Sequence, residues 1–347
     1  MIVFWAFEAV AAVAIALFAV AYWKGATLGA GPERAARASH VLFGSGVAAM
    51  ALALLPPIAS LAGHSFWMLQ VETLLLRFVG PMLIMLAAPA ALLVAGLPAR
   101  WRKRFPVEGD DPFFMDDEPP RGALAILRRP ALVTILFIGI FGFWQIPACL
   151  DAAVLHPALA VVMVLTLTAS GLLFWWRALD PRSPPLGPGY GARLSMLLFA
   201  TLTQIGLGAY LTVKETVLYP AFDVAGRLLH EHALSDETLG GAVIWVPGSI
   251  ICVLAAIAII HLWGKHETRV DQRRTSWSGS NSDALLFPTT GDALVENARP
   301  KNRLLAIGAA VFAAAMFAFV IVSGVLNHYD RTHGTAHAAP SSQMWTR

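Results

Sequence analysis

The sequence predicts an all-α protein, a polytopic membrane bundle of about eight transmembrane helices with both termini outside. Composition is the first observation behind this class, because the 347 residues are 57% hydrophobic and only 14% charged. The second is spacing, since the apolar residues fall into eight stretches, each about long enough to cross a hydrocarbon core of roughly 30 Å. Helices are expected in lipid because their backbone groups pair within one segment. The predicted partner is the lipid bilayer, and the net charge of +3 gives no argument for a nucleic acid.

The eight apolar stretches define the predicted spans. They cover residues 2–22, 41–62, 67–96, 131–149, 155–176, 191–213, 241–263 and 304–326. Pro81 and Pro89 in the third span and Pro247 in the seventh remove backbone hydrogen bonds, so we expect kinks there. The first stretch has no basic segment before it and no small-residue cleavage motif, and we interpret it as a retained helix.

Basic residues predict the orientation of the bundle. Of the 25 lysines and arginines, 20 lie in or beside the segments that follow the first, third, fifth and seventh spans. Because basic loops stay in the cytoplasm, these segments are expected inside and both termini outside. Seven of the ten histidines then belong to the outer side: His64, His156, His230, His232, His328, His333 and His337.

Composition divides the chain into four parts. Residues 1–263 form the predicted seven-helix body. Residues 264–302 are rich in serine and charged side chains, which are poor material for a packed core, and are expected to be a cytoplasmic linker. Residues 303–327 are an additional transmembrane helix expected to dock onto the body. The polar tail 328–347 is expected to be disordered and periplasmic.

Two charged residues, Glu72 and Arg77, lie among leucines in the third span. Ionisable side chains at that depth are costly unless they are paired. A separation of five residues places them about 140° apart around a helix, so we do not expect them to pair with each other. Each is predicted to contact another helix, with Asp151 or Glu215 as the partner of Arg77. A structural ion pair between helices and a functional pathway both stay open.

Four residues near the outer face are candidate ligands for Cu(I), a soft ion that favours thiolate, thioether and imidazole groups. His230 and His232 are separated by one residue, and Cys149 and His156 flank the short loop between the fourth and fifth spans. The alternative is that these histidines are ordinary hydrogen-bonding groups of the membrane interface. No haem is expected, because none of the histidines lies near the middle of a span, where a membrane cytochrome holds haem. No arrangement of residues predicts an enzyme.

Five tracts occur in a fixed order along the body. They are residues 80–89 (GPMLIMLAAP), 143–153 (FWQIPACLDAA), 171–176 (GLLFWW), 218–220 (LYP) and 236–248 (DETLGGAVIWVPG). Together they resemble the CtaG-like family of cytochrome c oxidase assembly factors, and the resemblance covers roughly residues 40–263. The positions that match the family's scaffold are Pro81, Pro89, Trp144, Pro147, Asp151, Trp175, Pro220, Asp236, Gly240, Gly241 and Trp245.

The chain departs from the family pattern at the histidines. The resemblance implies a His-x-x-x-His pair where this chain has Leu69 and Thr73, and a further histidine at Gln145. The family histidines of the fifth span fall on Ala160 and Val164. If those histidines bind copper in relatives, this chain cannot bind copper in the same way.

The resemblance implies a non-enzymatic assembly factor of the bacterial plasma (inner) membrane. Such a protein contacts cytochrome c oxidase subunits and helps to mature a haem-copper oxidase, with copper handled at the outer face. The alternative is a metal-free scaffold or accessory subunit of a respiratory complex, which the replaced histidines favour. A transporter ranks last, because no inverted repeat is evident and the middle of the spans is mostly Ala, Leu, Val and Phe.

Overall fold

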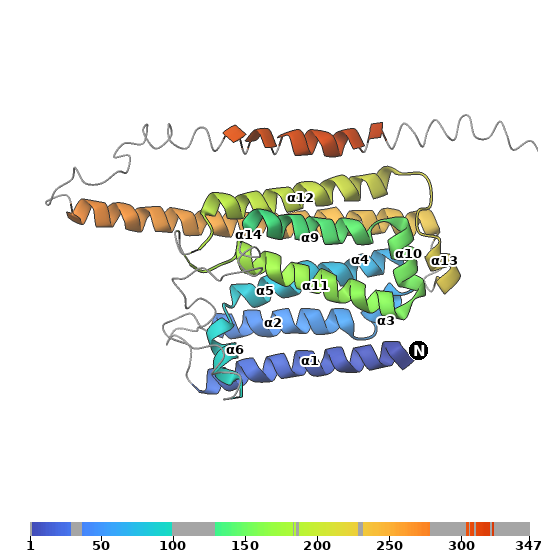
Figure 1. Cartoon of the computed structure of the whole chain (residues 1–347), viewed down its shortest axis with the longest axis horizontal. Coiled ribbons are helices and arrows are strands. Elements are labelled where there is room, and N and C mark those ends of the chain that lie inside the picture. The colour runs from blue at the N-terminus through green and yellow to red at the C-terminus, as the bar shows by residue number, and fades with distance from the viewer. Residues whose placement is uncertain are drawn as a thin grey trace, which may run out of the picture.

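The computed structural model describes residues 2–28, 37–98, 129–182, 184, 187–227, 232–277 and, with three single-residue gaps, 303–322. Every element among the described residues is a helix, so the predicted all-α class is confirmed. Figure 1 shows the long helices lying side by side. In chain order the elements are α1 (Ile2–Thr27), α2 (Arg37–Leu54), α3 (Ile58–Ala62), α4 (Phe66–Leu74), the π-helix η1 (Leu75–Val79), α5 (Gly80–Leu86), α6 (Ala90–Gly96), α9 (Pro130–Trp144), α10 (Pro147–Leu155), α11 (Pro157–Ala178), α12 (Tyr190–Val213), α13 (Ala221–Ala225) and α14 (Ala233–Trp277).

Five helices are long and apolar enough to cross a membrane: α2, the continuous run α4–η1–α5, α11, α12 and α14. The pair α9 and α10 forms a sixth span if the two helices, bent by 70° at Gln145–Ile146, count together. The described apolar parts of the other two predicted spans, Ala12–Thr27 and Ala306–Phe319, are shorter. The chain is therefore multi-pass, and the count of eight stays a prediction.

The third predicted span, 67–96, divides into two helices at Pro89. The continuous helix ends at Leu86, Ala88 takes a φ of 46°, and Pro89 is the residue before α6. A positive φ is unfavourable for alanine and proline cannot donate a backbone hydrogen bond, so the helix cannot continue through this point. Helix α6 instead packs against α1, where a Cβ built on Gly25 would lie only 1.8 Å from the Leu92 carbonyl oxygen.

The same run contains a π-helical turn, Leu75–Val79, just before Pro81. A π-turn widens the helix and disturbs its regular bonding, and here the Arg77 carbonyl accepts a hydrogen bond of 3.2 Å from Trp175 Nε1 of α11. The close approach needs Gly171, because a Cβ there would lie 2.5 Å from the same carbonyl oxygen. The predicted kink at Pro81 is thus accommodated by a π-turn without ending the helix.

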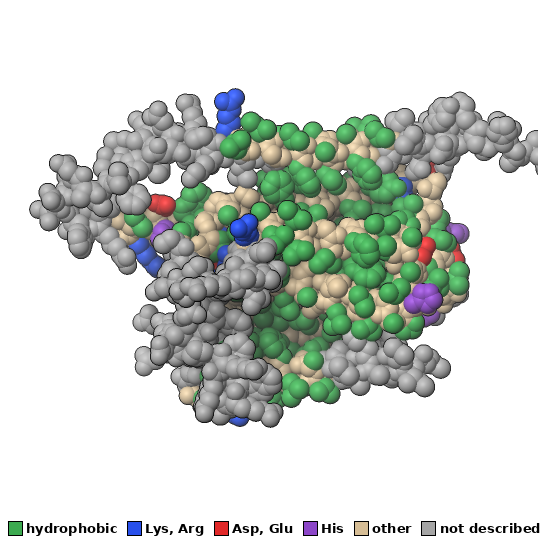
Figure 2. All heavy atoms as spheres, viewed as in Figure 1, with side chains coloured by type: hydrophobic (Ala, Val, Ile, Leu, Met, Phe, Trp, Pro, Cys, Tyr) green, Lys and Arg blue, Asp and Glu red, His purple; other side chains and the backbone are tan. Residues whose placement is uncertain are grey.

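The two ends of the bundle differ in character. Figure 1 shows α3, α10, α13 and the start of α1 at one end, which we call the α13 end, and α6 with the last turns of α14 at the other. Figure 2 shows histidines at the α13 end and hydrophobic side chains over the flank between the ends. The sequence predicts that the α13 end faces outward. The N-terminal helix begins there, whereas the C-terminal tail lies outside the described residues.

Helix α14 is longer than the sequence predicts. The seventh span was expected to end at residue 263, but the helix continues without interruption to Trp277, so the segment expected to be a linker begins as helix. The extension is rich in Glu, Lys, Arg and Gln, which favour helices, and Trp263 Nε1 donates to Glu267 Oε1 one turn later at 3.0 Å. Pro247 lies inside this helix without ending it.

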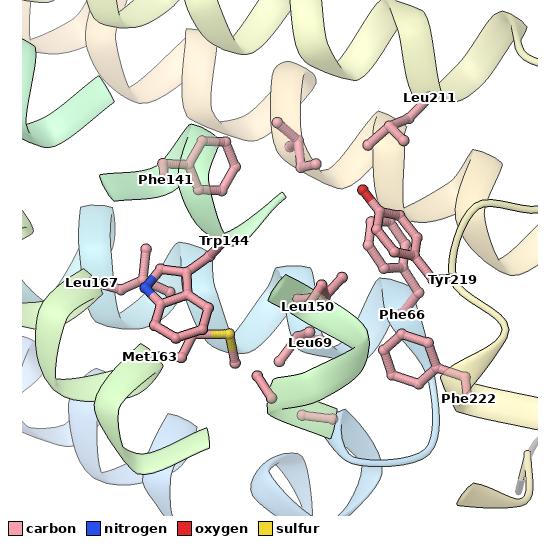
Figure 3. Packing of buried hydrophobic residues seen from close by; sticks show 13 residues of the cluster. Phe66, Leu69, Phe141, Trp144, Leu150, Met163, Leu167, Leu211, Tyr219 and Phe222 are labelled. Carbon is pink, nitrogen blue, oxygen red and sulfur yellow. The ribbon is translucent and has the colours of Figure 1, made fainter. Parts of the chain in front are cut away.

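Buried apolar side chains fill the space between the helices. Toward the α13 end, Phe66, Leu69, Trp144 and Tyr219 belong to one cluster of buried residues, shown in Figure 3. A second cluster lies around Trp175. The late helical segment near residues 310–319 contacts α12 through ring pairs and a methionine, and the residues involved are Phe199 with Phe312, Tyr210 with Phe319, and Met316 beside Gly206.

Candidate functional site

A carboxylate at the start of α14 caps a different helix, α4. Asp236 is buried and accepts hydrogen bonds of 2.9 Å from Ser65 Oγ and from the backbone N–H groups of Phe66 and Trp67. The first N–H groups of a helix have no partner within it, and here a residue from a distant part of the chain satisfies two of them. Arg227 forms an ion pair with the same carboxylate. Asp236 therefore fastens α14, α4 and the segment after α13 together.

The neighbouring carboxylate, Glu237, holds the segment between α12 and α13. Its side chain and that of Lys214 are both 0% exposed, and the two form an ion pair. The backbone N–H groups of Leu218 and Tyr219 donate to the same carboxylate at 3.0 and 2.8 Å. Lys214 Nζ also donates to the Thr216 carbonyl at 2.8 Å. A buried ion pair needs such additional hydrogen bonds to offset the loss of hydration, and the structure supplies them.

Tyr219 connects this segment to the bend between α9 and α10. Its hydroxyl donates to the Gln145 carbonyl at 2.8 Å, and its ring stacks on Phe66 with centroids 4.6 Å apart. Burial raises the pKa of the Tyr219 hydroxyl, which keeps it protonated as a donor. Close by, Asp151 of α10 accepts the Ala221 N–H at 3.4 Å. These contacts join α10 and α13 to the core.

Three of the four scaffold prolines stand at the start of a helix. A proline is tolerated there because the N–H that it lacks has no partner in the first turn. Pro147 opens α10, and Pro89 and Pro220 immediately precede α6 and α13. The fourth, Pro81, follows the π-turn inside the continuous run α4–η1–α5.

The scaffold glycines let α14 approach its neighbours. A Cβ on Gly240 would lie 2.3 Å from the Phe66 ring, and one on Gly241 would lie 2.9 Å from the Gly208 carbonyl of α12. Trp245 of α14 packs against Gly208 of α12, where an added Cβ would lie 2.5 Å from the indole ring. Small residues at a helix interface permit close packing in membranes. These family positions therefore serve helix packing.

The remaining scaffold tryptophan, Trp144, binds across to α11. Its indole Nε1 donates to Thr166 Oγ1 at 3.0 Å, and its ring belongs to the buried cluster at the α13 end. Trp175 makes the corresponding bond from α11 to η1 described above. Both tryptophans thus tie neighbouring helices together.

The two charged residues of the third span form no ion pair with each other, as the sequence predicts, but the carboxylate partner predicted for Arg77 is wrong. Arg77 is 2% exposed, donates from Nη2 to the Phe137 carbonyl at 2.7 Å and lies 3.6 Å from the Phe137 ring centroid. Among the described residues, no ion pair includes Arg77 or Glu72. Packing against aromatic faces replaces the carboxylate contact, because α9 presents phenylalanines at this level of the bundle. The carboxylates expected to pair with Arg77 were Asp151 and Glu215.

The candidate copper ligands are distributed over the α13 end. Cys149 is half-buried on α10, where it packs against the core cluster, and His156 is exposed between α10 and α11. His232 is exposed just before α14, and His230 lies outside the described residues. Within the part of the chain that the structure describes, no three His, Cys, Asp or Glu side chains are placed to share one metal ion. Copper binding therefore stays a prediction.

The positions at which the resemblance implies histidines are occupied by packed side chains. Leu69 and Val164 are buried among apolar residues. Gln145 donates from Nε2 to Gln70 Oε1 at 3.3 Å, and Thr73 lines a small internal cavity. Four of the five replacements are therefore buried in the interior, whereas Ala160 is half-buried.

Sequence reasoning missed two features of the interior. Nothing in the sequence indicated that Lys214, which follows the sixth predicted span, and Glu237 would be buried together. Gln70 and Gln204 face one cavity, although the middle of the spans was expected to be apolar. The available signal was the presence of two uncharged polar residues inside predicted spans.

Comparison with protein families decides what kind of scaffold this is. The family model of the cytochrome c oxidase caa3 assembly factor (Caa3_CtaG) matches residues 4–266. The chain belongs to this family. The match extends the resemblance seen in residues 40–263 to include α1, and it ends within α14 before the helical segment near residues 310–319. No curated protein and no solved structure matches the chain significantly.

Proposed function

We propose that this member of the caa3 assembly factor family is a non-enzymatic membrane protein that helps to assemble a haem-copper cytochrome c oxidase in the bacterial plasma membrane. The observation that carries the proposal is the family match over residues 4–266, which includes all the described helices from α1 to the membrane part of α14. The apolar, multi-pass body supports a site of action in the bilayer. Its partners are the lipid bilayer and subunits of the oxidase.

Copper insertion at the outer face is the finer form of this proposal. Cys149 offers a thiol on α10, while His156, between α10 and α11, and His232, just before α14, offer exposed imidazoles. Such groups suit Cu(I), which accepts ligands in low-coordinate arrangements of sulfur and nitrogen. His230 adds a second imidazole beside His232 in the sequence. Copper is then a cargo delivered to the oxidase, and no haem is expected.

Cu(I) binding by the detergent-purified chain tests this form directly. A chromophoric chelator competes with the wild type, with Cys149→Ser and with the double variant His230→Ala, His232→Ala. Cys252→Ala, which changes a thiol buried in the second cluster, and His261→Ala, on the exposed part of α14, are the matched controls. Binding lost in the first two variants and kept in the controls supports a copper site at the α13 end. Equal binding in all variants contradicts that location.

A metal-free scaffold is the second candidate function. It is favoured by the packed residues at the positions of the family histidines and by the absence of a three-ligand group among the described residues. This candidate predicts that the chain stays with the oxidase in stoichiometric amounts after mild solubilisation. A chain that never accompanies the mature complex, while a deletion strain makes oxidase with haem but without copper, would instead favour transient copper delivery.

A further inference from the structure

A small cavity lies between α4, η1, α9, α12 and α14. Its volume is about 10 Å³, close to the space that a single water molecule requires. The polar residues that line it are Gln70, Thr73, Arg77 and Gln204, and the remaining walls are leucine, isoleucine, valine and phenylalanine side chains. The cavity is therefore an isolated polar site inside an apolar bundle.

The cavity contains a positive charge without a visible counter-charge. Arg77 lies near the middle of the helical run Phe66–Leu86 and is 2% exposed. Its Nε has no hydrogen-bond partner, and no described ion pair includes its guanidinium. A guanidinium stays charged in proteins, and an unpaired buried charge costs several kcal/mol. The ring centroids of Phe137 and Phe141 lie 3.6 and 4.3 Å from Arg77 Cζ, and these cation–π contacts offset only part of that cost.

The other unpaired polar atom of the cavity is also a donor. Gln70 Oε1 accepts a hydrogen bond from Gln145 Nε2, while Gln70 Nε2 and, outside the cavity lining, Gln145 Oε1 have no hydrogen-bond partner. The amide of Gln204 is directed to its own helix, where Nε2 donates to the Ala200 carbonyl at 3.4 Å. No carboxylate lines the cavity. The site thus offers N–H donors and a positive charge, and it lacks an anion.

We propose that this cavity binds a chloride ion between the Arg77 guanidinium and the Gln70 amide. A monatomic anion accepts hydrogen bonds from both donors and supplies the missing charge in a medium where a charge pair is strong. Water would accept the same hydrogen bonds but would leave the charge unbalanced. Carboxylates and phosphates have several heavy atoms and exceed the space. Chloride is a single atom somewhat larger than water, and it bridges η1 and α4 of the same helical run.

Chloride binding is measured on the full chain, purified in detergent and exchanged into sodium gluconate. Radioactive chloride then reports saturable binding, and the midpoint of thermal unfolding is compared in sodium chloride and sodium gluconate of equal ionic strength. We expect about one chloride per chain and a higher midpoint in chloride, because a ligand of the folded state stabilises it. No saturable binding together with equal midpoints would mean that the cavity holds water only, and the proposal would be wrong.

Two variants locate the site. Gln70→Leu removes one donor and keeps the charge, so chloride affinity should fall about tenfold, the value of one hydrogen bond to a charged partner. Arg77→Gln should abolish the difference between chloride and gluconate. The control is Thr203→Val, which changes a hydroxyl bonded to its own helix next to Gln204. If Gln70→Leu binds chloride as tightly as the control, the ion lies elsewhere and the proposal fails, even where Arg77→Gln does not fold.

Discussion

The buried ion pair between Lys214 and Glu237 offers the sharpest test of how the α13 end is held together. In the variant Glu237→Gln, one amide oxygen still accepts the N–H groups of Leu218 and Tyr219. The new amide NH₂ group, however, faces the ammonium of Lys214, whose side chain is 0% exposed. Leaving one member of a buried pair without its partner costs about 3–5 kcal/mol. We therefore expect the free energy of unfolding to fall by that amount.

The companion variants make the reasoning quantitative. Lys214→Met leaves a carboxylate that keeps two backbone donors, so the loss should be smaller, about 2–3 kcal/mol. The double variant Lys214→Met, Glu237→Gln removes both charges and should be more stable than Glu237→Gln alone. A double-mutant cycle should then give a coupling energy larger than the loss in Lys214→Met alone, about 3 kcal/mol.

Unfolding by SDS in mixed micelles, followed by the fluorescence of the 11 tryptophans, measures each of these stabilities. Glu267→Gln is the control, since this exposed carboxylate on the same helix accepts a hydrogen bond from Trp263 and a surface change alters stability by no more than about 0.5 kcal/mol. The reasoning is refuted if the effects of the two single changes simply add in the double variant. It is also refuted if Glu237→Gln loses no more stability than the control.

Three further substitutions test other contacts with the same unfolding measurement. Asp236→Ala removes the acceptor for three donors at the start of α4, and we expect the free energy of unfolding to fall by about 2–4 kcal/mol. An unchanged stability would contradict the assignment of Asp236 as the cap of α4. Gly241→Val forces α14 away from α12 and should cost about 1–3 kcal/mol, whereas Gly191→Ala, where an added Cβ meets nothing within 4 Å, should be neutral or stabilising by up to about 1 kcal/mol. Trp175→Phe leaves the Arg77 carbonyl without its indole donor and should cost about 1–3 kcal/mol; an unchanged stability would show that this bond contributes nothing.

Local features of the sequence predicted the helices well. The apolar stretches long enough to span a bilayer correspond to the long helices, because a chain in lipid must pair its backbone groups within each segment. A kink at Pro89 was expected within one span, but the structure breaks the span into two helices there, since proline cannot continue the backbone bonding of a helix. The end of α14 was predicted wrongly at residue 263, because hydropathy reports the end of the apolar stretch, whereas helix propensity carries the same helix on to Trp277.

The candidate site was predicted less completely. The scaffold positions Asp236, Gly241 and Trp175 were identified from the family resemblance, but their contacts could not be, because each partner comes from a helix remote in the sequence. The predicted carboxylate partner of Arg77 was wrong, since spacing around one helix says only which way a side chain points and not which helix faces it.

What the sequence determined by itself is the class of protein, the approximate spans and the family, because hydropathy, proline and glycine positions act over a few neighbouring residues and are readable along the chain. Tertiary structure alone decided that Asp236 caps α4, that Lys214 and Glu237 are buried together, and that Arg77 shares a cavity with Gln70. These features depend on the packing order of the helices. Charges and polar groups inside an apolar bundle must find partners from whichever helix lies opposite, and that neighbour is set only when the whole body has folded.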